Sequence, residues 1–218
     1  MKRALAACVV VLAGCGTNRP QIPAELLAES GEGSLAGGCQ NPSYPGGPFG
    51  TVTGATIPNT CFRGWATPGT TEHDDVNLTD IGFGAFYDPT HKQYELLLVN
   101  TAALWCAACK AEHQTLGQHY AELAPQGLAI VSALFQNNAH EPADTSNLKQ
   151  WVETFDVKFP MVLDPDYQLG AYASADASPL NLLIDARTMR IMEQWAGDQS
   201  SVIWPTIQDE LTKRGAGE

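Results

Sequence analysis

The stretch that most constrains the fold is Tyr94–His113, where a strand-like run passes into the sequence Cys-Ala-Ala-Cys at residues 106–109. Glu95–Thr101 is apolar with no helical period, which is typical of a buried strand. A helical apolar pattern follows residues 106–109 and ends near Gly127, and Leu128–Leu134 reads as another strand. The pattern predicts a strand–helix–strand unit whose two strands are parallel.

The two cysteines of this unit are placed for thiol chemistry. Cys106 comes where the helix begins, so unpaired main-chain N–H groups and the helix dipole favour its thiolate. Cys109 follows three residues later, one helical turn away, close enough to form or resolve a disulfide. Glu112 is three residues beyond Cys109 and could exchange a proton with it. On spacing alone, however, Glu112 is better read as a solvated acid on the helix surface.

A zinc site is the competing interpretation of two cysteines at this spacing. Structural zinc requires two further ligands, commonly a second close pair of Cys or His. Cys39 and Cys61 are not so spaced, and His113 and His119 point to different faces of the helix. We therefore expect no metal.

The N-terminus has the pattern of a secretory signal peptide over residues 1–14, with a positive start and an apolar run too short to span a bilayer. Residues 12–15, Leu-Ala-Gly-Cys, resemble the bacterial lipobox. The resemblance implies that Cys15 carries the lipid anchor, and Gly16, where a retained inner-membrane lipoprotein has Asp, favours the outer membrane. An ordinary signal peptide is the alternative.

Residues 15–38 are rich in Gly, Pro and Ser and read as a flexible tether. We expect one domain over residues 39–218, with an N-terminal extension at 39–93 and a core at 94–218. Cys39 and Cys61 are the thiols left over, and an exported chain meets an oxidising compartment, which favours a structural disulfide between them. Two free thiols or a second redox pair are the alternatives.

The formal net charge of −12 argues against two classes of partner. Nucleic-acid phosphates and anionic lipid head groups would both be repelled by such a surface. The charge fits a soluble acidic domain and identifies no partner.

The sequence around the cysteine pair resembles the thioredoxin superfamily, in its membrane-tethered TlpA/ResA-like (redoxin) branch. Trp105 precedes the first cysteine, Asn100 stands six residues before it, and residues 106–112 match Cys-x-x-Cys-Lys-x-Glu. The resemblance implies a thioredoxin-like α/β fold: a central mixed sheet flanked by helices, with an N-terminal β-hairpin extension and a helix–strand insertion. It also implies that Glu112 assists thiol proton transfer. The chain departs from the family at Gln114, where Pro is usual.

The C-terminal half carries a second part of the resemblance. Ser178-Pro179, followed by the strand at 180–185, matches the segment whose proline is cis and packs against the cysteine pair. The resemblance implies that Trp105, Ser178 and Pro179 bind substrate. Between the two parts, Asn147 is expected to cap a helix whose apolar residues continue to Phe155.

These observations predict a thiol–disulfide oxidoreductase of the bacterial cell envelope, facing the periplasm, monomeric, with no cofactor beyond the Cys106–Cys109 disulfide. Its expected partners are protein thiols and disulfides and an upstream thiol redox partner. The alternatives are an envelope copper- or zinc-binding module and a non-catalytic binding module on the same fold. A peroxiredoxin would need Thr where Ala103 stands.

Overall fold

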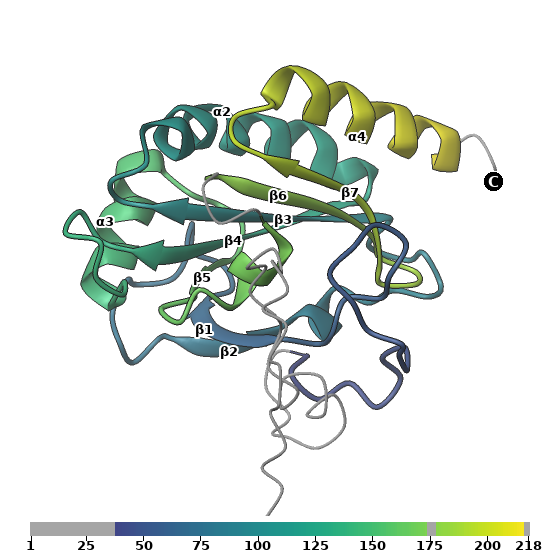
Figure 1. Cartoon of the computed structure of the whole chain (residues 1–218), viewed down its shortest axis with the longest axis horizontal. Coiled ribbons are helices and arrows are strands. Elements are labelled where there is room, and N and C mark those ends of the chain that lie inside the picture. The colour runs from purple at the N-terminus through teal and green to yellow at the C-terminus, as the bar shows by residue number, and fades with distance from the viewer. Residues whose placement is uncertain (1–37, 174–177, 216–218) are drawn as a thin grey trace, which may run out of the picture.

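The computed structural model describes residues 38–173 and 178–215. Within them, seven strands form one mixed sheet in the order β2-β1-β5-β4-β3-β6-β7 (Figure 1). The strands are β1 (Cys61–Trp65), β2 (Thr79–Gly82), β3 (Leu96–Ala103), β4 (Leu128–Gln136), β5 (Met161–Leu163), β6 (Leu180–Asp185) and β7 (Arg190–Ala196).

The strand that leads to the cysteine pair is β3, in which every residue is buried. It pairs in parallel with β4 and antiparallel with β6. Helix α2 (Ala107–Leu123) makes the crossover from β3 to β4, and the short 3₁₀ helix η2 (Ala124–Gln126) follows it. Gly127 ends this segment with φ of +98°, a left-handed conformation that glycine adopts without strain. The predicted strand–helix–strand unit is confirmed.

The three α-helices pack on the same face of the sheet. Apolar side chains of α2, α3 (Thr145–Phe155) and α4 (Ser200–Gly215) join one buried cluster with alternate residues of the central strands. Figure 1 shows α2 and α4 side by side above the sheet. Because successive strand residues point to opposite faces, the remaining strand residues must be covered from the other side.

The opposite face is covered by chain that precedes the sheet and by two 3₁₀ helices, η1 (Phe83–Ala85) and η3 (Gln168–Tyr172). Residues 54–57 run beside β7, where Gly54 N donates to Ile191 O at 2.7 Å and Ile57 N donates to Met189 O at 2.9 Å. The N-terminal extension therefore supplies part of the core as well as a cover for the edge strand.

The hairpin and the insertion predicted from the sequence are both present and meet in the sheet. Strand β1 pairs antiparallel with β2 on one side and with β5 on the other, and α3 leads into β5. One boundary was predicted wrongly: Asp144, not Asn147, is the N-cap of α3. Asp144 accepts from the main chain of Asn147, whose side chain binds back to Asp144 N, so the two share a capping box.

The predicted signal peptide, the predicted lipid attachment at Cys15 and the predicted tether up to residue 37 lie outside the described residues. Among the helices of the described ranges, none combines the length and apolar character needed to cross a membrane.

Candidate active site

The junction between β3 and α2 fixes the geometry of Cys106. Cys106 is the N-cap of α2 and has an extended backbone, and its N–H donates to Ala103 O at 3.0 Å. Its Sγ in turn accepts from Cys109 N at 3.0 Å. A sulfur held among the free N–H groups of a helix start is stabilised as a thiolate.

Cys106 and Cys109 are joined by a disulfide. Cys106 retains 4 % exposure whereas Cys109 has none, so a partner sulfur reaches Cys106 first. Such an arrangement would suit Cys106 to attack a partner disulfide and Cys109 to resolve the mixed disulfide that follows.

The start of β6 forms the wall beside Cys109. Ser178 Oγ lies 3.3 Å from Cys109 Sγ, and the Ser178–Pro179 peptide bond is cis. Leu180 N donates to Thr101 Oγ1 at 2.9 Å, which ties this segment to β3. The structure thus brings Ser178 and its neighbour Pro179 to the cysteine pair, as the resemblance implied.

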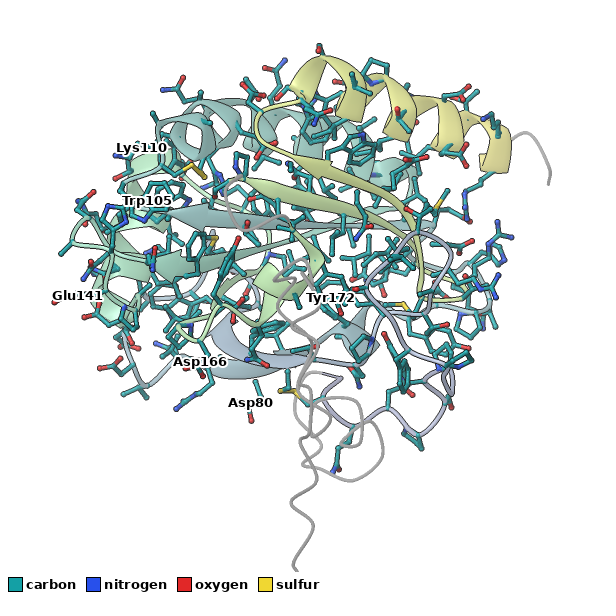
Figure 2. The ribbon with its side chains drawn as sticks, viewed as in Figure 1. Asp80, Trp105, Lys110, Glu141, Asp166 and Tyr172 are labelled. Atoms are coloured by element: carbon teal, nitrogen blue, oxygen red, sulfur yellow. A yellow bond between two sulfur atoms is a disulfide. The ribbon has the colours of Figure 1, made fainter. Side chains whose placement is uncertain are left out.

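Trp105 forms an exposed aromatic surface next to Cys106. Its ring is stacked on His140 with centroids 4.9 Å apart and meets Phe135 edge to face. Its Nε1 donates to Gln136 Oε1 at 3.0 Å. Figure 2 shows Trp105 and Lys110 close together at one end of the sheet. A fixed, partly exposed indole suits contact with an incoming polypeptide.

Glu112 is buried, so the interpretation from spacing alone, a solvated surface acid, is wrong. Asn100 Nδ2 donates to its Oε2 at 2.7 Å and Asn181 Nδ2 donates to its Oε1 at 2.8 Å. Burial raises the pKa of Glu112 to about 7, and the two amide hydrogen bonds oppose that rise. A carboxyl group that titrates near neutral pH can both accept and return a proton.

Three polar residues at the site were not predicted from the sequence. Asn181, Ser132 and His113 are buried around Asn100 and Glu112. For two of them the sequence did carry a signal, namely a polar residue inside an otherwise apolar strand. Ser132 interrupts LAIVSAL and Asn181 interrupts LNLLI.

The structure also joins Cys39 and Cys61 by a disulfide, at the start of β1. The Asn59 amide donates to the carbonyl oxygens of Gly38 and Cys39 at 2.9 and 3.1 Å, which fixes the approach of the N-terminal segment. Figure 2 shows Asp80 of the neighbouring strand β2 at the edge of the sheet, away from Trp105 at one end of it. The two disulfides therefore lie in separate regions.

In the described ranges, no three His, Cys, Asp or Glu side chains gather closely enough to hold a metal ion.

The chain is similar to known proteins in three respects. Residues 72–191 match the sequence model of the AhpC/TSA family. The chain is 30 % identical to the thiol:disulfide interchange protein DsbE of Yersinia pestis over 50 % of its length and 52 % of the relative's. It is 31 % identical to the DsbE of Vibrio cholerae over 56 % of its length and 60 % of the relative's. The chain thus spans about half to three fifths of these curated relatives.

Solved structures resemble the fold. A thiol:disulfide interchange protein from Bacteroides superposes with a TM-score of 0.53 at 16 % identity, covering 74 % of this chain and 91 % of its own. A thioredoxin family protein from Chlorobium tepidum superposes with a TM-score of 0.52 at 16 % identity, covering 73 % and 99 %. The predicted thioredoxin-like fold is confirmed, and because the family match spans more than half of the sequence, the chain belongs to the AhpC/TSA family.

Proposed function

We propose that the protein is a thiol–disulfide oxidoreductase that exchanges disulfides with protein substrates through Cys106 and Cys109. The observation that carries this proposal is the placement of Cys106: its sulfur caps a helix and accepts a main-chain hydrogen bond, while Cys109 lies beneath it. The relatives from Yersinia pestis and Vibrio cholerae are thiol:disulfide interchange proteins, which supports the same reaction class.

The reaction proceeds in two exchanges. The Cys106 thiolate attacks one sulfur of a substrate disulfide, a mixed disulfide forms, and the other substrate sulfur leaves as a thiolate. Cys109 gives its proton to Glu112 and attacks Cys106 Sγ, which releases the second substrate thiolate. The substrate gains two electrons and the Cys106–Cys109 disulfide forms. Run in reverse, the same steps oxidise a dithiol.

A second thiol redox partner completes each cycle. It restores the dithiol when the protein acts as a reductant, or the disulfide when it acts as an oxidant. Since the Cys106–Cys109 pair itself carries the electrons, we propose no further cofactor.

We place this chemistry in the bacterial cell envelope, on the periplasmic side. The signal-like residues 1–14 and the lipobox ending at Cys15 support export and lipid anchoring, with the outer membrane favoured by Gly16. The Cys39–Cys61 disulfide suits an oxidising compartment. The remaining domain would act as a monomer on its tether.

Insulin reduction tests the proposal directly. Purified protein supplied with dithiothreitol should accelerate reduction of the insulin interchain disulfides, and Cys106→Ser should not. If the wild type is inactive and Cys106→Ser behaves as wild type in cells, the chain is a binding module and the proposal is wrong. Turnover of hydrogen peroxide in place of insulin would likewise contradict it.

A further inference from the structure

A row of polar side chains crosses three neighbouring strands, β4, β3 and β6, beneath α2. Asn181 on β6, Asn100 on β3 and Ser132 on β4 lie opposite one another in the strand register. None of the three is exposed to solvent, and the strands around them are apolar. Burying polar groups is costly unless each is hydrogen-bonded, so the partners of this row determine what it does.

One end of the row holds Glu112. Asn100 Nδ2 donates to Glu112 Oε2 at 2.7 Å and to Asn181 Oδ1 at 2.9 Å, while Asn181 Nδ2 donates to Glu112 Oε1 at 2.8 Å. Both carboxylate oxygens therefore have an amide donor. Turning the Asn100 amide over would place its oxygen against the carboxylate, so the pattern fixes the orientation of the amide.

The other end of the row returns to α2 through Ser132 and His113. Ser132 Oγ donates to Asn100 Oδ1 at 2.8 Å, and His113 Nε2 lies 3.1 Å from Ser132 Oγ. His113 Nδ1 lies 3.1 Å from the main-chain oxygen of Cys109. Glu112 and His113 are adjacent in α2 and point to different strands. The helix that carries Cys109 therefore contacts the row at both ends, through Glu112 at one and His113 at the other.

A proton count shows how Asn100 depends on Ser132. Three contacts link Cys109 O to Asn100 Oδ1, both of which only accept, and a neutral imidazole and a hydroxyl group supply one proton each. Because Asn100 Oδ1 only accepts, the hydroxyl proton of Ser132 lies in their contact, and Ser132 Oγ accepts from His113 when Nε2 carries the imidazole proton. In that tautomer His113 Nδ1 faces Cys109 O without a proton. Within the described residues, no other hydrogen bond holds Asn100 Oδ1.

We propose that Ser132 and His113 are positioning residues for thiol–disulfide exchange: they hold the Asn100 amide with its N–H groups toward Glu112, and so keep the carboxylate able to take and return the proton of Cys109. The inference rests on the proposed function, because it assigns these residues to the same reaction. Neither residue touches substrate.

Loss of the Ser132 hydroxyl group would free Asn100 Oδ1. The amide could then turn its oxygen toward Glu112, and the carboxylate would lose a donor, which favours its protonated form. The other charged group that acts on Glu112 from a different element is Asp198, between β7 and α4, and it also favours the protonated form. Around His113, the rings of Trp151 and Phe155 pack at 5.0 and 5.7 Å and carry no charge.

The test follows the Glu112 carboxyl group itself by ¹³C NMR in reduced protein with labelled glutamate, using Glu112→Gln to assign the signal. In Ser132→Ala the titration midpoint should rise by about one pH unit, as expected for weakening one charge-assisted hydrogen bond. Phe155→Leu is the matched control: it loosens the packing beside His113, keeps every hydrogen bond of the row and should leave the midpoint unchanged.

An unchanged midpoint in Ser132→Ala, or an equal shift in Phe155→Leu, overturns the inference. If Ser132→Ala does not fold, the wild type still decides, because the ¹⁵N signals of His113 at pH 8 should place the proton on Nε2. A proton on Nδ1 would leave Nε2 as an acceptor that cannot donate to Ser132 Oγ, and would contradict the positioning role proposed for His113. Neither measurement depends on enzyme activity, so an inactive wild type would refute the proposed function separately.

Discussion

The two disulfides of the protein make an instructive pair, because the more exposed one is the one that we expect to be inert. Cys61 is exposed at the start of β1, whereas Cys106 and Cys109 are buried at the start of α2. Exposure alone would therefore direct reductants to the Cys39–Cys61 bond.

The surroundings of the sulfurs reverse that expectation. In the proposed reaction, reduction of Cys106–Cys109 yields a thiolate on Cys106 at a helix start, and the buried Glu112, three residues beyond Cys109, exchanges the second proton. Neither thiolate of a reduced Cys39–Cys61 pair would be stabilised in a comparable way. Reduction would also remove the bond that holds the N-terminal segment, which covers one face of the sheet. A disulfide is thus reactive when its reduced form is stabilised, and structural when the fold depends on its oxidised form.

The largest effect should come from Cys106→Ser. Removing the attacking sulfur abolishes the mixed disulfide, so the rate of insulin reduction should fall by roughly a thousand-fold or more, to the uncatalysed background. The double variant Cys39→Ser/Cys61→Ser is the control and should retain most of the wild-type rate. Equal losses in the two variants would remove the functional distinction between the disulfides.

The same double variant should show the next largest effect, on stability. The Cys39–Cys61 bond closes a loop over a sequence separation of 22 residues, and in the chain-entropy model its loss costs about 3 kcal/mol of unfolding free energy. Urea denaturation of the wild type and the double variant measures this difference. Unchanged stability would mean that the N-terminal segment holds to the sheet without the bond.

Glu112→Gln should slow exchange about ten- to a hundred-fold, the usual range for a lost general acid–base group. Because the pKa of Glu112 is raised to about 7, the carboxyl group becomes able to accept a proton as pH rises through 7. The wild-type rate should therefore increase as pH rises through 7, and the rate of the variant should not show this increase. A wild-type profile that is retained in Glu112→Gln excludes the carboxyl group from the proton transfer.

The raised pKa has a consequence of opposite sign for stability. The folded protein holds the Glu112 proton more tightly than the unfolded chain does, so ionisation of Glu112 destabilises the fold as pH rises from about 4.5 to about 7. The unfolding free energy of Glu112→Gln, relative to the wild type, should therefore increase over the same range.

The smallest effect should come from Trp105→Ala. Losing the exposed ring removes substrate contact without touching either sulfur, and we expect KM for insulin to rise about three- to tenfold with kcat little changed. Trp105→Phe keeps an aromatic surface and should lie close to wild type. A fall in kcat with KM unchanged would show that Trp105 acts on the chemistry instead of on binding.

The features that could be predicted from the sequence are those determined by local patterns of apolar and polar residues. The change of period after Thr101 located β3, α2 and the helix start that holds Cys106, and the apolar strand β4 followed from the same rule. The cap of α3 was predicted wrongly because Asp and Asn both favour the N-cap position. The geometry of the capping box in the folded protein makes Asp144 the N-cap and Asn147 the N3 residue.

The polar row could not be predicted for a different reason. Ser132 and Asn181 meet Asn100 only because β4, β3 and β6 pair in a particular register, and register is a property of the folded sheet. The same holds for Glu112, whose burial depends on β6 lying beneath α2. The position of Glu112 along α2 predicts which side of the helix carries it, but not which residues pack against that side.

A redox titration of both disulfides in one sample would distinguish the reactive pair from the structural pair most directly. Equilibration against glutathione or dithiothreitol buffers, alkylation of free thiols and mass spectrometry would give the reduced fraction of each pair. We expect Cys106–Cys109 to be reduced at a potential between about −270 and −120 mV, while Cys39–Cys61 remains oxidised to below about −300 mV. Reduction of Cys39–Cys61 first, or of both pairs in one step, would contradict the assignment of Cys106–Cys109 as the reactive pair.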